Sequence, residues 1–331
     1  MVLCTIAIPV FNRERLIGRC LESALAQQVT GLEILVIDNC SSDQTWSVVN
    51  HYSDPRLRLV RNDRNLGLFG NFNRCLELAR GKYLRFLCSD DALTESCLER
   101  EIAAMDLHPT ASILTTRGQA IDSSGKQLYK FAKLFPAGLY GGSDAIAAAL
   151  WLYAHYKYNP FNYPSGVLLR RECALRAGQF NTSMRMAADV EFFLKTLEYG
   201  DLFVQTECGC LAIVHEEQAS AKLRGDDCTI REMYALLEKF RHHLGASGVY
   251  ERVRKQMGAI TLGLAWKCWA QGLNEASRKH YDIMADQGLT AVTSVLPLLR
   301  LLSYRVLHKL TGCVINVPGR SKPLSDKAIS A

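Results

Sequence analysis

The sequence of residues 82–91 is Lys82-Tyr83-Leu84-Arg85-Phe86-Leu87-Cys88-Ser89-Asp90-Asp91. The apolar run within it predicts a buried strand, and the two adjacent carboxylates of Asp90 and Asp91 follow where that strand ends. Like charges side by side repel each other, so the pair favours a site that receives a positive ion. Carboxylates are the hard oxygen ligands that Mg²⁺ and Mn²⁺ prefer, usually between protein and phosphate. A solvated turn that caps a helix over 92–105 is the alternative interpretation.

Short apolar strands alternate with amphipathic helices through the first ninety residues. Strands are expected at 2–10, 33–37, 56–60 and 83–88, with helices at 13–28, 43–52 and 68–79. This order predicts an α/β fold with a parallel, doubly wound sheet. Ligands of such sheets bind at the carboxyl ends of the strands, which is where Asp38 and the Asp90–Asp91 pair fall.

Two common nucleotide-binding classes lack their motif in this sequence. No G-x-G-x-x-G follows the first strand, and no G-x-x-x-x-G-K-[ST] occurs, so a dinucleotide dehydrogenase and a P-loop NTPase lose their main support. A nucleotidyltransferase would normally carry a glycine-rich basic loop after the first strand. The corresponding residues, 12–15, contain no glycine.

Composition is that of a globular protein, with 331 residues, 48% hydrophobic residues and a formal net charge of +6. Residues 289–331 hold six basic residues against Asp326 alone, so the rest of the chain is close to neutral. This distribution argues against a nucleic-acid partner. The twelve cysteines are scattered without a C-x-x-C pair, and no signal peptide is apparent. We therefore expect a reducing, cytoplasmic location.

Further strands are expected at 166–169, 203–204 and 210–214, and residues 121–140 are expected to be loop-rich. The pattern then changes near residues 224–227, where a charged stretch interrupts the chain. We expect an α/β catalytic unit over 1–225 and a helical region over 226–331 that contacts a membrane or a partner. An amphipathic helix over 289–310 would place the chain peripherally at the inner face of a membrane. A helix packed against the catalytic unit is the alternative for this segment.

Several motifs in a fixed order resemble those of family 2 glycosyltransferases, which are inverting enzymes of the GT-A fold. The matching segments are Thr5-Ile6-Ala7-Ile8-Pro9-Val10-Phe11-Asn12-Arg13, 32–43, Asn65-Leu66-Gly67, 81–83 and 86–91. The resemblance covers about residues 3–220. It implies a nucleotide-diphospho-sugar transferase with a Rossmann-like, mostly parallel sheet and a C-terminal helical extension.

The resemblance implies a donor site at matching positions. Pro9 and Phe11 would line the nucleotide base, and Asp38 would accept a hydrogen bond from the uracil N3–H. Asn65 belongs to the same nucleotide-sugar-binding set, and Asp90 is expected near the ribose. The alternatives are a strand terminator for Pro9, a core aromatic for Phe11 and an Asx-turn for Asp38.

The resemblance also implies a metal site for Mn²⁺ or Mg²⁺ on the donor diphosphate. Asp91 is the expected ligand, with Asp90 beside it and His215 as a further candidate. Many family members carry another Asp where this sequence has Cys88, so the identity of the ion is left open.

The general base implied by the resemblance is Asp189, in the segment 185–195. Ala188 stands where the family usually has Glu. The alternative is that Asp189 is a helix N-terminal charge favoured by the dipole. Glu191 lies two residues further on, hence on a different helix face.

The resulting expectation is an inverting transferase that moves a sugar from a UDP- or dTDP-sugar to a hydroxyl of a glycan or lipid-linked saccharide acceptor. A non-catalytic nucleotide-sugar-binding or scaffold protein on a degenerate fold is the alternative that Cys88 and Ala188 support. The acceptor pocket is expected within residues 121–162, where aromatic residues such as Tyr153 and Phe161 either stack on sugars or fill a core.

Overall fold

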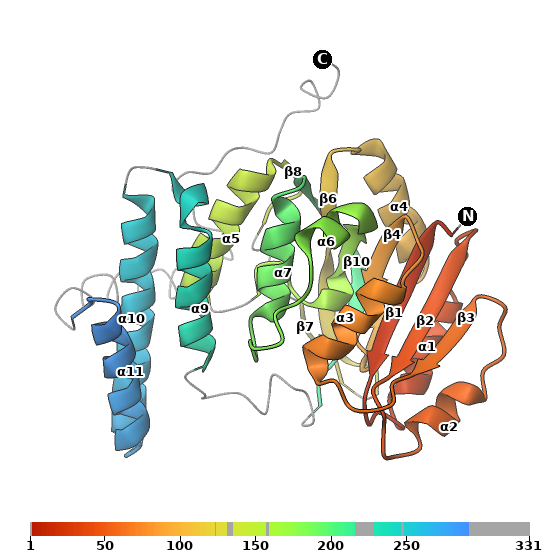
Figure 1. Ribbon diagram of the computed structural model, residues 1–331, viewed down its shortest axis with the longest axis horizontal. Helices are drawn as coiled ribbons and strands as arrows, with labels where there is room; N and C mark the ends of the chain where they lie inside the picture. The colour runs from red at the N-terminus through yellow and green to blue at the C-terminus, as the bar shows by residue number, and fades with distance from the viewer. Residues whose placement is uncertain are drawn as a thin grey trace.

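The computed structural model describes residues 2–122, 124–130, 135–156, 159–215, 228–245 and 248–290 (Figure 1). Residues 4–86 show the predicted alternation of strands and helices. The elements are β1 (Cys4–Val10), α1 (Ile17–Leu25), β2 (Leu32–Asp38), α2 (Thr45–Asn50), β3 (Leu57–Arg61), α3 (Leu68–Leu78) and β4 (Tyr83–Phe86). These four strands are parallel and lie in the order β3-β2-β1-β4.

The second part completes the sheet in a mixed arrangement. Its elements are β5 (Asp91–Leu93), α4 (Cys97–Leu107), β6 (Ala111–Ile121), β7 (Gln127–Lys130), β8 (Gly138–Tyr140), α5 (Gly142–Tyr156), η1 (Pro164–Gly166), β9 (Val167–Arg170), α6 (Arg171–Ala177), α7 (Ala188–Leu197) and β10 (Asp201–Ile213). Within the described residues, ten strands form one sheet, and its order continues from β4 through β9, β6 and β10 to β5. Strand β9 is antiparallel to both of its neighbours, whereas β6 and β10 are parallel.

The structure corrects three expected elements of this second part. A helix expected over 92–105 begins only at Cys97, because residues 91–93 pair with β10 as a strand. Residues 121–140, expected to be loop-rich, contain β7 and β8. Two late strands expected at 203–204 and 210–214 are parts of β10, whose pairing with β6 shifts register between them.

Alternating side chains of the central strands build a hydrophobic core on each face of the sheet. Ala7, Leu35 and Phe86 point into one core, which α3, α5 and α7 cover. The apolar residues that alternate with these in the same strands point to the opposite face of the sheet, into a second core that α1 and α4 cover. Period-two alternation therefore buries both faces, as expected of a parallel sheet with helices on each side.

The C-terminal helices pack onto the first of these cores. They are α9 (Cys228–Lys239), η2 (Arg241–Leu244), α10 (Val249–Ala270) and α11 (Asn274–Asp286). Leu236, Met257 and Ile283 belong to the core that α5 and α7 also line, and α10 contacts α5 as well as α11. These helices lie at the opposite end of the molecule from β1–β3 (Figure 1).

Two predictions for the C-terminal half fall largely outside the described residues. The expected boundary near 225 lies within 216–227, and of the expected amphipathic helix at 289–310 only residues 289 and 290 are described. Among the helices that the structure describes, none is both long and apolar enough to cross a membrane.

A buried ion pair connects the sheet to α4. Arg85 of β4 donates to Glu101 of α4, and both side chains are almost completely buried. A second guanidinium nitrogen of Arg85 donates to the Gly209 carbonyl at 3.4 Å. A Cβ atom at Gly209 would lie 2.5 Å from a carboxylate oxygen of Glu101, so only glycine leaves room for the pair.

Candidate active site

The predicted base-binding residues lie at the carboxyl ends of β1 and β2. Pro9 is buried in β1 opposite Ile37, beyond the point where β1 pairs with β4, so its missing N–H costs no ladder bond with β4. Phe11 follows the strand and is 40% exposed, so the interpretation as a core aromatic is wrong. An exposed ring at this edge is available to a planar ligand.

Asp38, the last residue of β2, is completely buried and held by groups of this chain. The backbone N–H of Ser41 donates to both carboxylate oxygens at 3.2 and 3.3 Å, and Arg61 Nε lies 3.0 Å from Oδ2. The contact shapes the turn after β2, but it reaches three residues along the chain, whereas an Asx-turn reaches two. A contact between Asp38 and a uracil stays a prediction.

Asn65 belongs to a network of asparagine side chains that fixes the loop after β3. Its Oδ1 accepts from Asn39 Nδ2 at 2.9 Å and from the Gly67 N–H at 2.8 Å. Asn62 in turn donates to Asn39 and Asn71. The Asn65 side chain is exposed, but its oxygen already has two donors. Its visible role is to hold the loop in shape.

Asp90 and Asp91 form a compact group with Cys88 and His215. One potential ligand atom from each of Cys88, Asp90 and Asp91 lies within 4.8 Å of the others. His215 Nε2 lies 2.9 Å from Asp90 Oδ2, so the imidazole predicted from a distant part of the sequence does meet the carboxylate pair. The two carboxylates are hard oxygen ligands that suit Mn²⁺ or Mg²⁺, and the imidazole is a further candidate ligand beside them.

Asp91 is the more deeply placed of the two carboxylates. It is only 4% exposed, and Ser165 Oγ donates to its Oδ2 at 2.5 Å. Burial and the neighbouring charge of Asp90 raise the pKa of Asp91 well above its usual range. Burial and the same two carboxylates raise the pKa of the Cys88 thiol, so Cys88 offers a neutral, weak ligand.

Asp189 lies in the first turn of α7 and is partly exposed. Asn159 Nδ2 donates to its Oδ2 at 2.7 Å, and the Val190 N–H donates to Oδ1 at 2.8 Å. Desolvation outweighs both hydrogen bonds and raises the pKa of Asp189 to about 6. A carboxylate with a pKa near the working pH suits a general base. By contrast, Glu191 is 3% exposed and its Oε1 lies 2.8 Å from Lys239 Nζ.

One short segment contacts both acidic sites. Asn159 holds Asp189, and six residues later Ser165 holds Asp91. The segment contains two tight turns, in which Asn162 N–H donates to the Asn159 carbonyl and Gly166 N–H donates to the Tyr163 carbonyl. Two β-turns joined by one peptide unit span less than about 18 Å between the first and last Cα atoms. The two acidic sites therefore lie at the two ends of one compact connection.

The C-terminal helices contact the backbone that carries Asp189. Glu232 of α9 accepts hydrogen bonds from three consecutive backbone N–H groups just before α7, at residues 185, 186 and 187 and distances of 2.6, 2.9 and 2.7 Å. A carboxylate in front of a helix N-terminus also interacts favourably with the helix dipole. Helix α9 therefore helps to fix where α7 begins.

Sequence reasoning did not identify Asn159, Ser165 or Glu232, because each acts on a partner distant in sequence and belongs to a common polar type. The structure also decides between the two interpretations of the aromatic residues expected in the acceptor pocket. Tyr153 and Phe161 are 6% and 0% exposed and lie in the hydrophobic core, so at these positions the core-filling alternative is correct.

The sequence of this chain is similar to one protein family and to several named proteins. The model of the family described as Glycosyl transferase family 2 matches residues 5–163. An uncharacterized Mycobacterium tuberculosis protein, MT1568, is 32% identical over 197 residues, 59% of this chain and 62% of that protein. The Escherichia coli UDP-Glc:alpha-D-GlcNAc-diphosphoundecaprenol beta-1,3-glucosyltransferase WfaP is 34% identical over 32% of this chain and 42% of its own. The chain thus spans less than two thirds of either relative.

Solved structures share the fold at low sequence identity. TarS residues 1–349 from S. aureus, in complex with UDP-GlcNAc, aligns with a TM-score of 0.59 and 15% identity over 88% of this chain and 93% of that one. The Pyrobaculum calidifontis mannosyltransferase PcManGT, in complex with GDP-Man and Mn²⁺, gives 0.55 and 16% over 93% and 81%.

The likeness to these structures confirms the expected GT-A fold with its helical C-terminal region. The family match contains the donor-side residues and both residues of the carboxylate pair, and it ends before Ser165, Asp189 and His215. The family match and the named relatives confirm the expected resemblance to family 2 glycosyltransferases over residues 5–163.

Proposed function

We propose that this protein is a metal-dependent inverting glycosyltransferase. It transfers a sugar from a UDP- or dTDP-linked donor to a hydroxyl group of a glycan or lipid-linked saccharide. The names of two similar proteins support the donor and acceptor classes, since TarS was solved with UDP-GlcNAc and WfaP is named for a diphosphoundecaprenol-linked acceptor.

The observation that carries this proposal is the short connection between two acidic sites. Asp91 and Asp189 are both held by side chains of residues 159–166. A displacement with inversion needs stabilisation of the leaving group on one side of the sugar and a base on the other. Two carboxylate sites at opposite ends of a compact segment suit that requirement.

Asp90 and Asp91, with His215 beside them, are the residues that would hold Mn²⁺ or Mg²⁺. Such an ion supplies positive charge that stabilises the departing diphosphate. Ser165 orients Asp91 by donating to its Oδ2. The Mn²⁺ in the PcManGT complex supports the choice of ion class.

Asp189 is the proposed acceptor of the proton from the attacking hydroxyl. Asn159 occupies Oδ2 and the Val190 N–H occupies Oδ1, so the carboxylate is held in one orientation. Each carboxylate oxygen keeps a further lone pair for the incoming hydroxyl. Unlike a glycosidase, the reaction requires no second carboxylic acid to protonate the leaving group.

A screen of nucleotide sugars tests the proposed function. With Mn²⁺ present, one UDP- or dTDP-sugar should raise the melting temperature, because a ligand at 100 times its Kd stabilises the folded state by about 2.7 kcal/mol. The same donor should be slowly hydrolysed or transferred, and EDTA should abolish that turnover. Turnover unchanged by EDTA would contradict the metal role. Binding without any turnover would support the scaffold alternative instead.

The pH dependence of kcat/KM should report on Asp189. The base works only when deprotonated, so kcat/KM should rise with pH through an apparent pKa of about 6. The Asn159 hydrogen bond stabilises the charged form, so Asn159→Ala should shift the acid limb to higher pH. Asn50→Ala, which removes an exposed amide that donates to the Trp46 carbonyl of its own helix, serves as the control and should leave the profile in place. An unshifted limb in Asn159→Ala would rule out Asp189 as its origin.

A further inference from the structure

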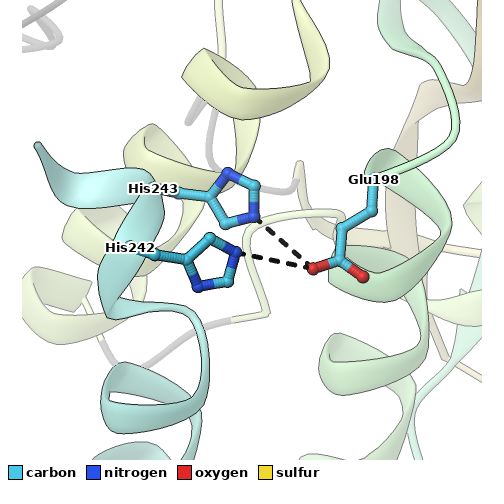
Figure 2. Close-up of side chains that lie close together, drawn as sticks. All are labelled: Glu198, His242 and His243. Carbon is cyan, nitrogen blue, oxygen red and sulfur yellow. Dashed lines mark ion pairs between the residues drawn. The ribbon is translucent and has the colours of Figure 1, made fainter.

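Outside the candidate active site, two histidines and a glutamate converge where the C-terminal helices meet α7. Figure 2 shows the His242 and His243 imidazoles pointing at the Glu198 carboxylate. Glu198 follows the last turn of α7, and both histidines lie in η2. One potential ligand atom from each residue lies within 4.8 Å of the other two.

The distances within this cluster are too long for good hydrogen bonds. His243 Nε2 lies 3.5 Å and His242 Nε2 lies 3.8 Å from the same oxygen, Glu198 Oε1. Hydrogen bonds from N–H to O normally measure 2.7–3.2 Å. Two ligands of a tetrahedral Zn²⁺ with metal–ligand bonds of about 2.0–2.1 Å lie about 3.3 Å apart. The nitrogen–oxygen distances of 3.5 and 3.8 Å are therefore closer to the ligand–ligand distance of a zinc site than to the centre of the hydrogen-bond range.

The environment of His243 prepares one ring nitrogen for a cation. Its Nδ1 lies 2.9 Å from Ser143 Oγ at the start of α5, so Nδ1–H can donate to this hydroxyl. Its Nε2 is buried and, among the described residues, has no hydrogen-bond partner. A metal-binding histidine commonly donates its other ring N–H to an oxygen in this way, which fixes the tautomer.

The charge state of the His243 imidazole also suits a metal ligand. Burial and the neighbouring His242 lower the pKa of His243, which favours the neutral form of the ring. A neutral Nε2 that faces a carboxylate oxygen presents one lone pair to another, and a cation between them removes that repulsion. Neutral imidazole is also the form that binds a metal ion.

We propose that Glu198, His242 and His243 bind one Zn²⁺ ion. Two imidazoles and one carboxylate favour Zn²⁺ over Mg²⁺, which prefers oxygen ligands and keeps its water. The His242 side chain is 62% exposed, so water has access to the fourth position of the ion. Bound there, the ion fastens η2 to the end of α7, and α7 carries Asp189 in its first turn. The site is separate from the Asp90–Asp91 pair and does not depend on the proposed transferase activity.

Zinc titration of the full chain, free of any histidine tag and of bound metal, tests the site. The titration is run with Mg²⁺ in excess, so that the carboxylate pair is occupied by a hard ion. We expect one saturable Zn²⁺ site per chain in wild type and none in His243→Ala. Ser143→Ala removes the hydrogen bond at Nδ1 of His243 and should weaken Zn²⁺ binding roughly 10–100-fold. Substituting Co²⁺ should give the intense visible absorption of a tetrahedral site.

His51→Ala is the matched control, because this exposed histidine hydrogen-bonds the Ser47 carbonyl of its own helix and lies far from the cluster in sequence. It should bind Zn²⁺ as wild type does. Glu198→Gln, which keeps the shape of the side chain, guards against loss of folding in His243→Ala and should also lose the site. No saturable binding in wild type, or equal binding in wild type and His243→Ala, overturns the proposal and leaves an ordinary histidine–glutamate ion pair.

Discussion

Replacing Asp189 by asparagine should lower kcat by about 10²–10⁴-fold, the usual contribution of a general base. An amide has nearly the same shape as the carboxylate and can still accept the hydrogen bond from Asn159 through its oxygen. It cannot take a proton from the attacking hydroxyl. Affinity for the donor should stay close to wild type, because Asp189 is proposed to act on the acceptor. Single-turnover kinetics and donor titration together measure both quantities.

Asp144→Asn is the matched control for this prediction. Asp144 is also an acidic residue in the first turn of a helix, α5, and its side chain is exposed. If Asp189 merely complements the helix dipole, the two substitutions should have similar, small effects. A kcat for Asp189→Asn within about tenfold of wild type, below the range for a general base, would contradict the proposed role.

Replacing Glu101 by alanine should destabilise the protein by about 3–5 kcal/mol, the cost of leaving a buried charge without its partner. The guanidinium of Arg85 would remain in the interior with the Gly209 carbonyl at 3.4 Å as its remaining described acceptor. The pair lies between the sheet and α4, so water reaches it only if that packing opens. The loss should appear as a lower urea midpoint with little change in the m value.

The double variant Arg85→Leu with Glu101→Leu distinguishes a lost charge partner from a lost side chain. It removes both charges and fills the space with apolar groups, and such replacements are often neutral or stabilising. We expect it to recover most of the loss. The exposed pair Arg74–Glu77 supplies the control, because breaking it should cost at most about 1 kcal/mol. A cost this small for Glu101→Ala would show that Arg85 finds another partner.

The parallel half of the sheet was predictable because two independent signals agreed there. Apolar runs marked β1, β2 and β4, and polar residues such as Asp38 and Asp90 appeared where those strands end. Strand β9 was expected at its place in sequence, but its three apolar residues carry no information about strand direction. The polar residues Gln205 to Glu207 made β10 read as two strands, although the chain continues through a register shift.

The acidic residues of the candidate site could be predicted from the family motifs, whereas the side chains that hydrogen-bond to them could not. Asn159 acts across 30 residues and Ser165 across 74. Serine and asparagine occur throughout loops, so neither position carries a spacing signal before the fold is known. For aromatic residues, too, the sequence did not predict burial: Phe11 is exposed, whereas Tyr153 lies in the core.

The contact between Glu232 and the three amides before α7 limits how the two halves of this chain can be recombined. Exchanging residues 228–290 for those of a relative would create a chimera in which the donor-side motifs are untouched. Unless the incoming helix brought an acidic side chain to position 232, the amides of residues 185–187 would lose their acceptor. Engineering of new acceptor preferences by swapping C-terminal modules should therefore treat position 232 as part of the catalytic half.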